Sequence, residues 1–235
     1  MNTPIEKRQV PANFNRVARW YDALQRMNPG YSEHLALSAR RIAAPPGAKL
    51  LDLCCGTGLS TAALRSTYPG ARIDAVDASE GMLEVARLRG LEPPVRYLLA
   101  DVMELTPEQL DGPYDGILMA YGIRNMPDAD AALKRLFPLL KKGATVCFHE
   151  YSVADSVWSR LMWNVVSFTV IIPLGQLTSP GAPIYRYLRR SVTEFDGVRR
   201  FEQRLRDAGF ADVRTEPTGG WAKQIVHSFL ARRPQ

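Results

Sequence analysis

The sequence predicts an α/β protein in which helices flank a doubly wound, mostly parallel β-sheet. Strand-like and helix-like apolar segments alternate along residues 49–150, and Pro and Gly pairs separate them. One predicted strand runs into the glycine turn 56–58, and a helix follows that turn. Acidic residues end three successive predicted strands: Asp52, Asp77 and Asp101. This alternation is typical of a parallel sheet covered by helices on both faces.

Two helices are predicted before the sheet. Residues 1–11 are polar and are expected to be a mobile lead-in. A helix with apolar residues at helical spacing follows, and Asn13 is its expected cap. A second helix is predicted over 32–42, which completes an N-terminal helical segment, 12–43.

The core, 48–150, is predicted to alternate between strands and helices. The expected strands are 49–53, 72–76, 95–100, 114–120 and 144–150. The expected helices are 58–68, 80–89, 107–111 and 129–140. An apolar insertion, 151–195, precedes the closing part of the chain, 196–235, with a helix near 198–208 and strands near 212–216 and 223–231. We interpret the 235 residues as a single domain.

The turn Gly56-Thr57-Gly58 is a candidate nucleotide site. A helix N-terminus presents backbone N–H groups, and glycine lets a ligand approach the main chain. The turn lacks the third glycine of the G-x-G-x-x-G fingerprint and the Lys-Ser/Thr pair of a P-loop. The remaining pattern, acid-x-x-x-Gly-x-Gly, also occurs in tight strand-to-helix connections that bind nothing.

The acidic strand ends strengthen the ligand interpretation. Asp77 lies nineteen residues after Gly58, about where doubly wound folds place a carboxylate for ribose hydroxyls. Asp101 closes the next predicted strand. Because ligands bind outside the carboxyl ends of strands in such sheets, we expect a site there.

Composition excludes several classes of protein. The chain has 46% hydrophobic and 23% charged residues, as ordinary globular proteins have. Its net charge of +6 suits either an anionic membrane surface, an acidic ligand or simple solvation, and nothing resembles a nucleic-acid module. Three cysteines are too few for a disulfide framework, and no metal-ligand spacing is present. The first residues lack a signal-peptide core, so the cytoplasm is the expected location.

Several motifs resemble a known family. Asp52-x-Cys54-Cys55-Gly56-Thr57-Gly58, Asp77-Ala78-Ser79 and Ala100-Asp101 resemble class I S-adenosylmethionine-dependent methyltransferases. Tyr121-Gly122-Ile123-Arg124-Asn125 resembles the Gly-x-Arg-Asn segment of the ubiquinone/menaquinone biosynthesis C-methyltransferase family. The resemblance covers about residues 14–232 and implies a Rossmann-like, seven-stranded sheet, S-adenosylmethionine as cofactor and a small lipophilic quinol as acceptor. It also implies that the helical segment 12–43 forms a cover over the cofactor.

The resemblance also implies roles in cofactor binding. Asp77 would accept hydrogen bonds from both ribose hydroxyls. Asp101 and the N–H group of Val102 would meet the adenine edge, and Gly56, Thr57 and Gly58 would line the nucleoside and methionine portions.

Three further residues each have a functional and a structural interpretation. Asp52 anchors the turn or contacts the methionine amine through water, or it is only a local cap. Met82 packs on the adenine or fills the core, and Tyr21 packs near the cofactor or docks a helix.

Arg124 and Asn125 follow the fourth predicted strand, on the expected ligand side. A ring carbon attacks well when an adjacent hydroxyl is ionised, which needs a base or a group that stabilises the oxyanion. Arg124 stays protonated, so we expect it to lower a phenol pKa or orient a water while Asn125 fixes the oxygen. Alternatively, Arg124 pairs with a carboxylate and holds the loop. His149, Glu150 and Tyr151 are further candidate bases or structural residues.

Residues 161–177 form the least regular and most apolar stretch. Polar residues interrupt it, which argues against a membrane span of about 20 apolar residues. It is a buried insertion, a lid over a lipophilic substrate, or a patch that touches the membrane surface. Tyr185 and Tyr187, beyond it, are candidates to line a quinol pocket.

Departures from the family pattern leave the acceptor open. Asn15 and Leu59 stand where the family often has Asp. The segment Trp221-Ala222-Lys223-Gln224 is bulkier and more polar than the short apolar segment that the family usually has there. The alternatives are O- or N-methylation of a small specialised metabolite or lipid headgroup, and a non-catalytic methyltransferase-fold subunit. The oligomeric state is not predicted.

Overall fold

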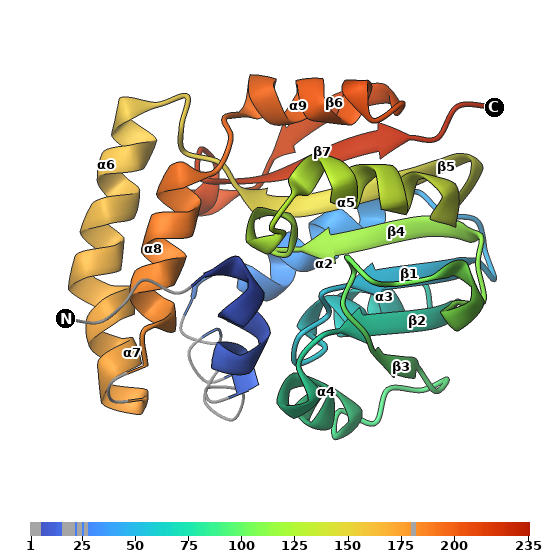
Figure 1. Ribbon diagram of the computed structural model, residues 1–235, viewed down its shortest axis with the longest axis horizontal. Coiled ribbons are helices and arrows are strands. Elements are labelled where there is room, and N and C mark those ends of the chain that lie inside the picture. The colour runs from blue at the N-terminus through green and yellow to red at the C-terminus, as the bar shows by residue number, and fades with distance from the viewer. Residues whose placement is uncertain (1–5, 16–21, 23–24, 26–27, 180–181) are drawn as a thin grey trace.

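A seven-stranded sheet forms the centre of the protein (Figure 1). The computed structural model describes residues 6–15, 22, 25, 28–179 and 182–235. The strand order is β3-β2-β1-β4-β5-β7-β6, and β7 pairs antiparallel with β5 and β6. The strands are β1 (Lys49–Leu53), β2 (Arg72–Asp77), β3 (Arg96–Leu99), β4 (Tyr114–Ala120), β5 (Leu140–Tyr151), β6 (Ala211–Pro217) and β7 (Val226–Arg232). The predicted fold class, doubly wound and mostly parallel, is confirmed.

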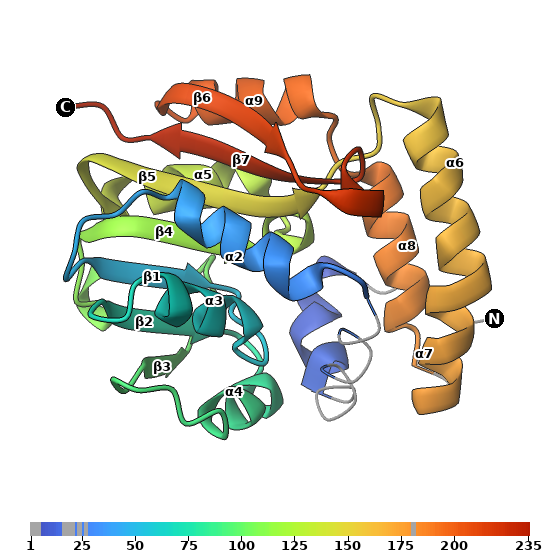
Figure 2. The same cartoon turned by 180° about the vertical axis from the view of Figure 1, so that it is seen from behind.

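Helices cover both faces of the sheet, as the two opposite views show (Figures 1 and 2). One face carries α2 (Tyr31–Arg41) and α3 (Leu59–Thr67), and the other carries α5 (Ala129–Leu136) and α9 (Val198–Asp207). A further helix, α4 (Glu80–Arg87), connects β2 to β3. Short helical turns are η1 (Lys7–Gln9), η2 (Pro107–Gln109), η3 (Ile123–Asn125), η4 (Phe137–Leu139) and η6 (Gly220–Ala222).

Alternation along the strands explains the two apolar layers. Leu50 belongs to the cluster under α2 and α3, whereas Leu51 and Leu53 belong to the cluster under α5 and α9. Successive side chains of a strand point to opposite faces, so a strand that is buried on both sides reads as a continuous apolar run.

The insertion is more regular than predicted. Helix α6 (Val157–Val166), the π-helical turn η5 (Ser167–Ile171) and α7 (Ile172–Thr178) form one 22-residue helix beside α8 (Ile184–Glu194) (Figure 1). By length and composition this helix could cross a membrane, despite the polar interruptions that argue against a span. Only 17% of its most apolar window is buried, so the interpretation as a buried insertion is wrong.

Other boundaries differ from the prediction for local reasons. The first helical turn starts at Lys7, and Asn13 lies inside the helix, where its amide donates to the Gln9 carbonyl instead of capping. The predicted helix 107–111 is only the turn η2. Gly143 does not separate a helix from β5, because β5 already begins at Leu140 and bends at a register shift opposite β4.

Candidate active site

A cavity of about 680 Å³ lies at the carboxyl ends of β1, β2, β3 and β4. Strand order reverses between β1 and β4, which is where doubly wound sheets bind their ligands. Seven predicted site residues line this cavity: Gly56, Asp77, Met82, Asp101, Val102, Arg124 and Asn125. We call it the polar cavity.

Backbone N–H groups hold the Asp77 carboxylate at the rim of the glycine turn. Its Oδ2 accepts from the Gly56 N–H at 2.8 Å, and its Oδ1 accepts from the Ser79 N–H at 2.9 Å. Burial raises the pKa of Asp77 to about 6, although these N–H groups act to lower it. Each oxygen keeps acceptor capacity, so the carboxylate is suited to two hydroxyl donors.

The two glycines of the turn serve different purposes. Gly56 has φ +54°, and a Cβ there would have no atom within 4 Å, so its bare main chain faces open space in the polar cavity. Gly58 has φ +82°, and its Cβ would meet the Ala86 Cβ at 3.1 Å. Gly56 therefore fits a ligand cradle, whereas Gly58 allows α3 to pack closely on α4.

Asp52 and Thr57 lie behind this cradle, outside the described lining of the polar cavity. Asp52 is fully buried and accepts from the Ser60 and Thr61 hydroxyls at 2.8 and 2.6 Å, at the start of α3. Burial raises the pKa of Asp52 to about 7. The Thr57 hydroxyl donates to Asp22, which pairs with Arg89. The contacts of Asp52 fit both its predicted anchoring role and the alternative of a local cap, and its contact with the methionine amine stays a prediction.

Asp101 and Met82 both line the cavity but differ in solvent exposure. The Asp101 side chain is exposed, and its Oδ1 accepts from the Met103 N–H at 2.8 Å. Met82 is buried under the cavity floor. Tyr21 lies outside the described residues.

A second cavity, of about 590 Å³, adjoins the first. Side chains of the long helix line one wall, and they are apolar: Met162, Trp163, Val166, Val170, Ile171 and Leu174. Tyr185, Tyr187 and Leu188 of α8 line another part. Phe14, Tyr121 and Arg124 line both cavities, which therefore meet at these three residues. We call the second one the apolar cavity.

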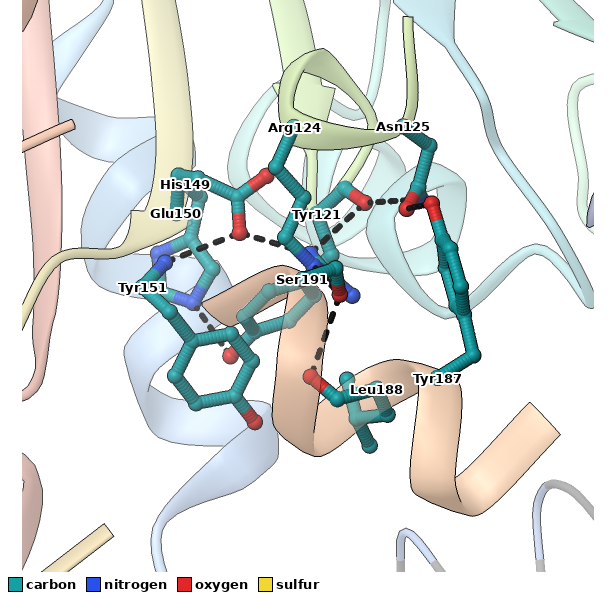
Figure 3. Close-up of polar contacts among 9 residues, drawn as sticks. All are labelled: Tyr121, Arg124, Asn125, His149, Glu150, Tyr151, Tyr187, Leu188 and Ser191. Atoms are coloured by element: carbon teal, nitrogen blue, oxygen red, sulfur yellow. Dashed lines mark hydrogen bonds and ion pairs between the residues drawn. The ribbon is translucent and has the colours of Figure 1, made fainter. Parts of the chain in front are cut away.

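Arg124 forms a buried ion pair at this junction (Figure 3). Its Nη1 donates to Glu150 Oε1 at 2.6 Å and to the Tyr121 carbonyl at 2.9 Å. Burial would lower the pKa of Arg124, but Glu150 raises it, so the guanidinium stays charged. The predicted alternative, a carboxylate partner, is thus present. Arg124 Nε donates to Ser191 Oγ at 3.3 Å, and the Arg124 side chain lines both cavities.

Asn125 is occupied by protein partners (Figure 3). Its Nδ2 donates to the Tyr121 carbonyl at 3.0 Å, and its Oδ1 accepts from the Tyr187 hydroxyl at 3.0 Å. These contacts tie η3 to α8. They assign Asn125 a role in holding the junction, and its predicted contact with an acceptor oxygen stays a prediction.

Tyr121 is the residue at the junction that the sequence pattern did not single out. Its φ of +57° is rare for a residue with a side chain, and it turns the carbonyl toward both Arg124 and Asn125. Its ring packs against Tyr31 and Tyr151, with centroids 5.8 and 4.8 Å away. Its place directly before the Gly-x-Arg-Asn run was the available signal.

The profile of the ubiE/COQ5 methyltransferase family matches residues 2–228. The chain belongs to this family. The demethylmenaquinone methyltransferase of Lactococcus lactis is 30% identical over 99% of this chain and 94% of its own length. The ubiquinone/menaquinone biosynthesis C-methyltransferase UbiE of Rhodopseudomonas palustris is 32% identical over 93% of this chain and 90% of its own.

Solved methyltransferases share the fold. A possible histamine N-methyltransferase of Thermotoga maritima has a TM-score of 0.66 at 19% identity, over 95% of this chain and 99% of its own. Human N-acetylserotonin methyltransferase, solved with S-adenosylmethionine, has a TM-score of 0.64 at 17% identity, over 93% of this chain and 56% of its own. The predicted enzyme class, an S-adenosylmethionine-dependent methyltransferase, is confirmed by the family.

Proposed function

We propose that this methyltransferase methylates a ring carbon of a lipophilic quinol, a benzoquinol or naphthoquinol. The observation that carries the proposal is the junction of two unlike cavities at Phe14, Tyr121 and Arg124. The polar cavity suits a charged nucleoside cofactor, and the apolar cavity suits a lipophilic ring and its side chain. The names of the Lactococcus and Rhodopseudomonas relatives support a quinone precursor as the acceptor.

The polar cavity fits S-adenosylmethionine at three points. The open space above Gly56 lets the cofactor reach the main chain, and the two Asp77 oxygens suit its ribose hydroxyls. Asp101 and the Val102 N–H group suit the adenine edge, while Met82 packs beneath. When bound, S-adenosylmethionine supplies an activated methyl group on a cationic sulfur.

Residues at the junction activate the acceptor in this proposal. A quinol hydroxyl that loses its proton to solvent becomes an oxyanion, which raises the electron density on the neighbouring ring carbon. Arg124 is charged and lines both cavities, so it stabilises that oxyanion and lowers the phenol pKa. The ring carbon then forms a C–C bond as the methyl–sulfur bond breaks, and it loses its proton to solvent when aromaticity returns. Orientation of the ring by the apolar cavity contributes to the rate.

Product analysis tests the proposal. We expect isotope from labelled S-adenosylmethionine to appear on a ring carbon of a demethylated quinol presented in detergent, with fragmentation by mass spectrometry to locate it. Label on oxygen or nitrogen, or transfer only to polar acceptors, would overturn it in favour of O- or N-methylation.

We also propose that this enzyme works at the membrane surface, where such an acceptor is dissolved. One face of the long helix lines the apolar cavity, and its outer face exposes large apolar side chains: Val157, Trp158, Leu161, Val165, Phe168 and Leu177. The exposed Arg160 and Arg186 lie on the long helix and on α8, and the whole chain carries +6. An apolar face with flanking arginines suits an anionic bilayer surface.

A further inference from the structure

We propose that the Tyr121 hydroxyl donates a hydrogen bond to the acceptor's oxygen, and that a buried chain from Arg41 through Ser228, Ser38 and His149 fixes it as a donor. This inference rests on the proposed function and adds a second oxyanion donor beside Arg124. Tyr121 is the catalytic residue of this proposal, since it contacts the acceptor. Ser38 and His149 are positioning residues.

The chain is continuous, joins three elements and ends at Tyr121, directly after β4. Arg41 Nη1 of α2 lies 2.7 Å from Ser228 Oγ of β7, and Ser228 Oγ lies 2.7 Å from Ser38 Oγ of α2. Ser38 Oγ lies 2.7 Å from His149 Nδ1 of β5, and His149 Nε2 lies 2.9 Å from the Tyr121 hydroxyl (Figure 3). Ser38, His149 and Ser228 are wholly buried. Water therefore does not interrupt the chain.

Arg41 fixes the direction of the first hydrogen bond in this chain. A guanidinium only donates, and an ion pair with Glu216 and a bond to the Pro217 carbonyl hold Arg41 in place. Ser228 accepts from Arg41, and in the proposed direction it donates its own proton to Ser38. Ser38 in turn donates to Nδ1 of His149.

His149 passes this direction to Tyr121. Burial lowers the pKa of His149 to about 3, so its ring is neutral at physiological pH. A neutral ring that accepts at Nδ1 carries its one proton on Nε2. Nε2 then donates to the Tyr121 hydroxyl, which directs its own proton away from His149.

The position of Tyr121 decides where that proton acts. Tyr121 lines both cavities next to Arg124, whose guanidinium lies 5.8 Å from the Tyr121 ring centroid. The Tyr121 N–H donates to the His149 carbonyl at 2.8 Å, which fixes the ring relative to β5. A donor fixed before the reaction stabilises developing negative charge without reorganisation. The recognised group is thus an aromatic hydroxyl that becomes an oxyanion.

Nitrogen-15 NMR of the full chain tests the direction without any turnover. His149 is one of three histidines, and His149→Gln assigns its signals. We expect the neutral tautomer with the proton on Nε2 in the wild type, and loss of that preference in Ser38→Ala. A proton on Nδ1 in the wild type reverses the chain and overturns the proposal, whatever the acceptor.

Kinetics test the consequence. Tyr121→Phe is expected to lower kcat on a demethylated quinol by about 10²–10³-fold, the usual effect of losing one oxyanion donor, with the cofactor Kd within about twofold of wild type. The control Tyr68→Phe removes a hydroxyl that donates to the Ala39 carbonyl, outside both cavities, and should retain kcat. Wild-type kcat in Tyr121→Phe overturns the inference and leaves quinol methylation intact. A wild type that methylates no quinol overturns the proposed function, and the tautomer alone then decides the direction of the chain.

Discussion

The two cavities of this methyltransferase are assembled differently. The polar cavity is built largely from short strand-end segments, and its key carboxylate, Asp77, is held by the N–H groups of Gly56 and Ser79. The apolar cavity joins α2, the ends of β4 and β5, the long helix and α8, which are far apart in sequence. The cofactor site is therefore encoded in local turns, whereas the acceptor site depends on how distant elements pack.

The largest effect is expected at the junction. Arg124→Met leaves Glu150 buried without its ion-pair partner, with its Oε2 already lacking a hydrogen-bond partner among the described residues. We expect urea denaturation to show a free energy of unfolding lower by about 3–5 kcal/mol. The double variant Arg124→Met/Glu150→Gln removes both charges and should recover most of that loss, while quinol turnover stays low. Equal stability of the single variant and the wild type would contradict the buried ion pair.

A pH titration tests the polar cavity alone. Ribose hydroxyls donate to an ionised carboxylate, and the pKa of Asp77 in the free protein is about 6. Below pH 6 the Asp77 carboxyl is mostly protonated and must lose its proton when the cofactor binds. The Kd for S-adenosylmethionine should therefore rise about tenfold for each pH unit below 6 and become constant above about pH 7. Calorimetry at a series of pH values measures the Kd in both pH ranges. Asp77→Asn should weaken binding by roughly 10–100-fold at about pH 8 and lose this pH dependence. A wild-type Kd independent of pH would exclude the contact.

Gly56→Ala tests whether the cofactor contacts the main chain at the glycine turn. The new Cβ would enter the polar cavity at φ +54°, a conformation that costs about 1–2 kcal/mol for a residue with a side chain. We expect a loss of stability of this size in urea denaturation and a cofactor affinity about tenfold weaker by calorimetry. Gly70→Ala is the control, because its Cβ also meets no atom but its φ is not positive. Equal affinities in the two variants would contradict the assignment.

The smallest effect is expected on the outer face of the long helix. Phe168→Ser with Leu177→Ser removes two exposed apolar side chains and should weaken sedimentation with anionic vesicles by about tenfold, about 1.4 kcal/mol. Leu88→Ser is the control, because Leu88 is 86% exposed but follows α4, away from this helix. Vesicle binding as tight as the wild type in the double variant would show that the outer face does not dock.

The sequence by itself determined the fold class, the order of the core elements and the residues of the glycine turn. Strand alternation and the conformational needs of glycine are local properties, so the order of residues alone was enough to place Gly56, Asp77 and Asp101 at one edge of the sheet. The same reasoning could not separate the uses of Gly56 and Gly58, since only the packing of α3 on α4 does so.

Tertiary structure decided the acceptor side. Pairing of β4 with β5 puts Ala120 opposite His149, and this register brings Tyr121 to His149 and Arg124 to Glu150. No local period reveals a contact between residues 26 or 28 positions apart, because it depends on which strands become neighbours. The sequence also could not predict which face of residues 157–178 lines the cavity and which is exposed. That division arises only when α8 packs against the helix.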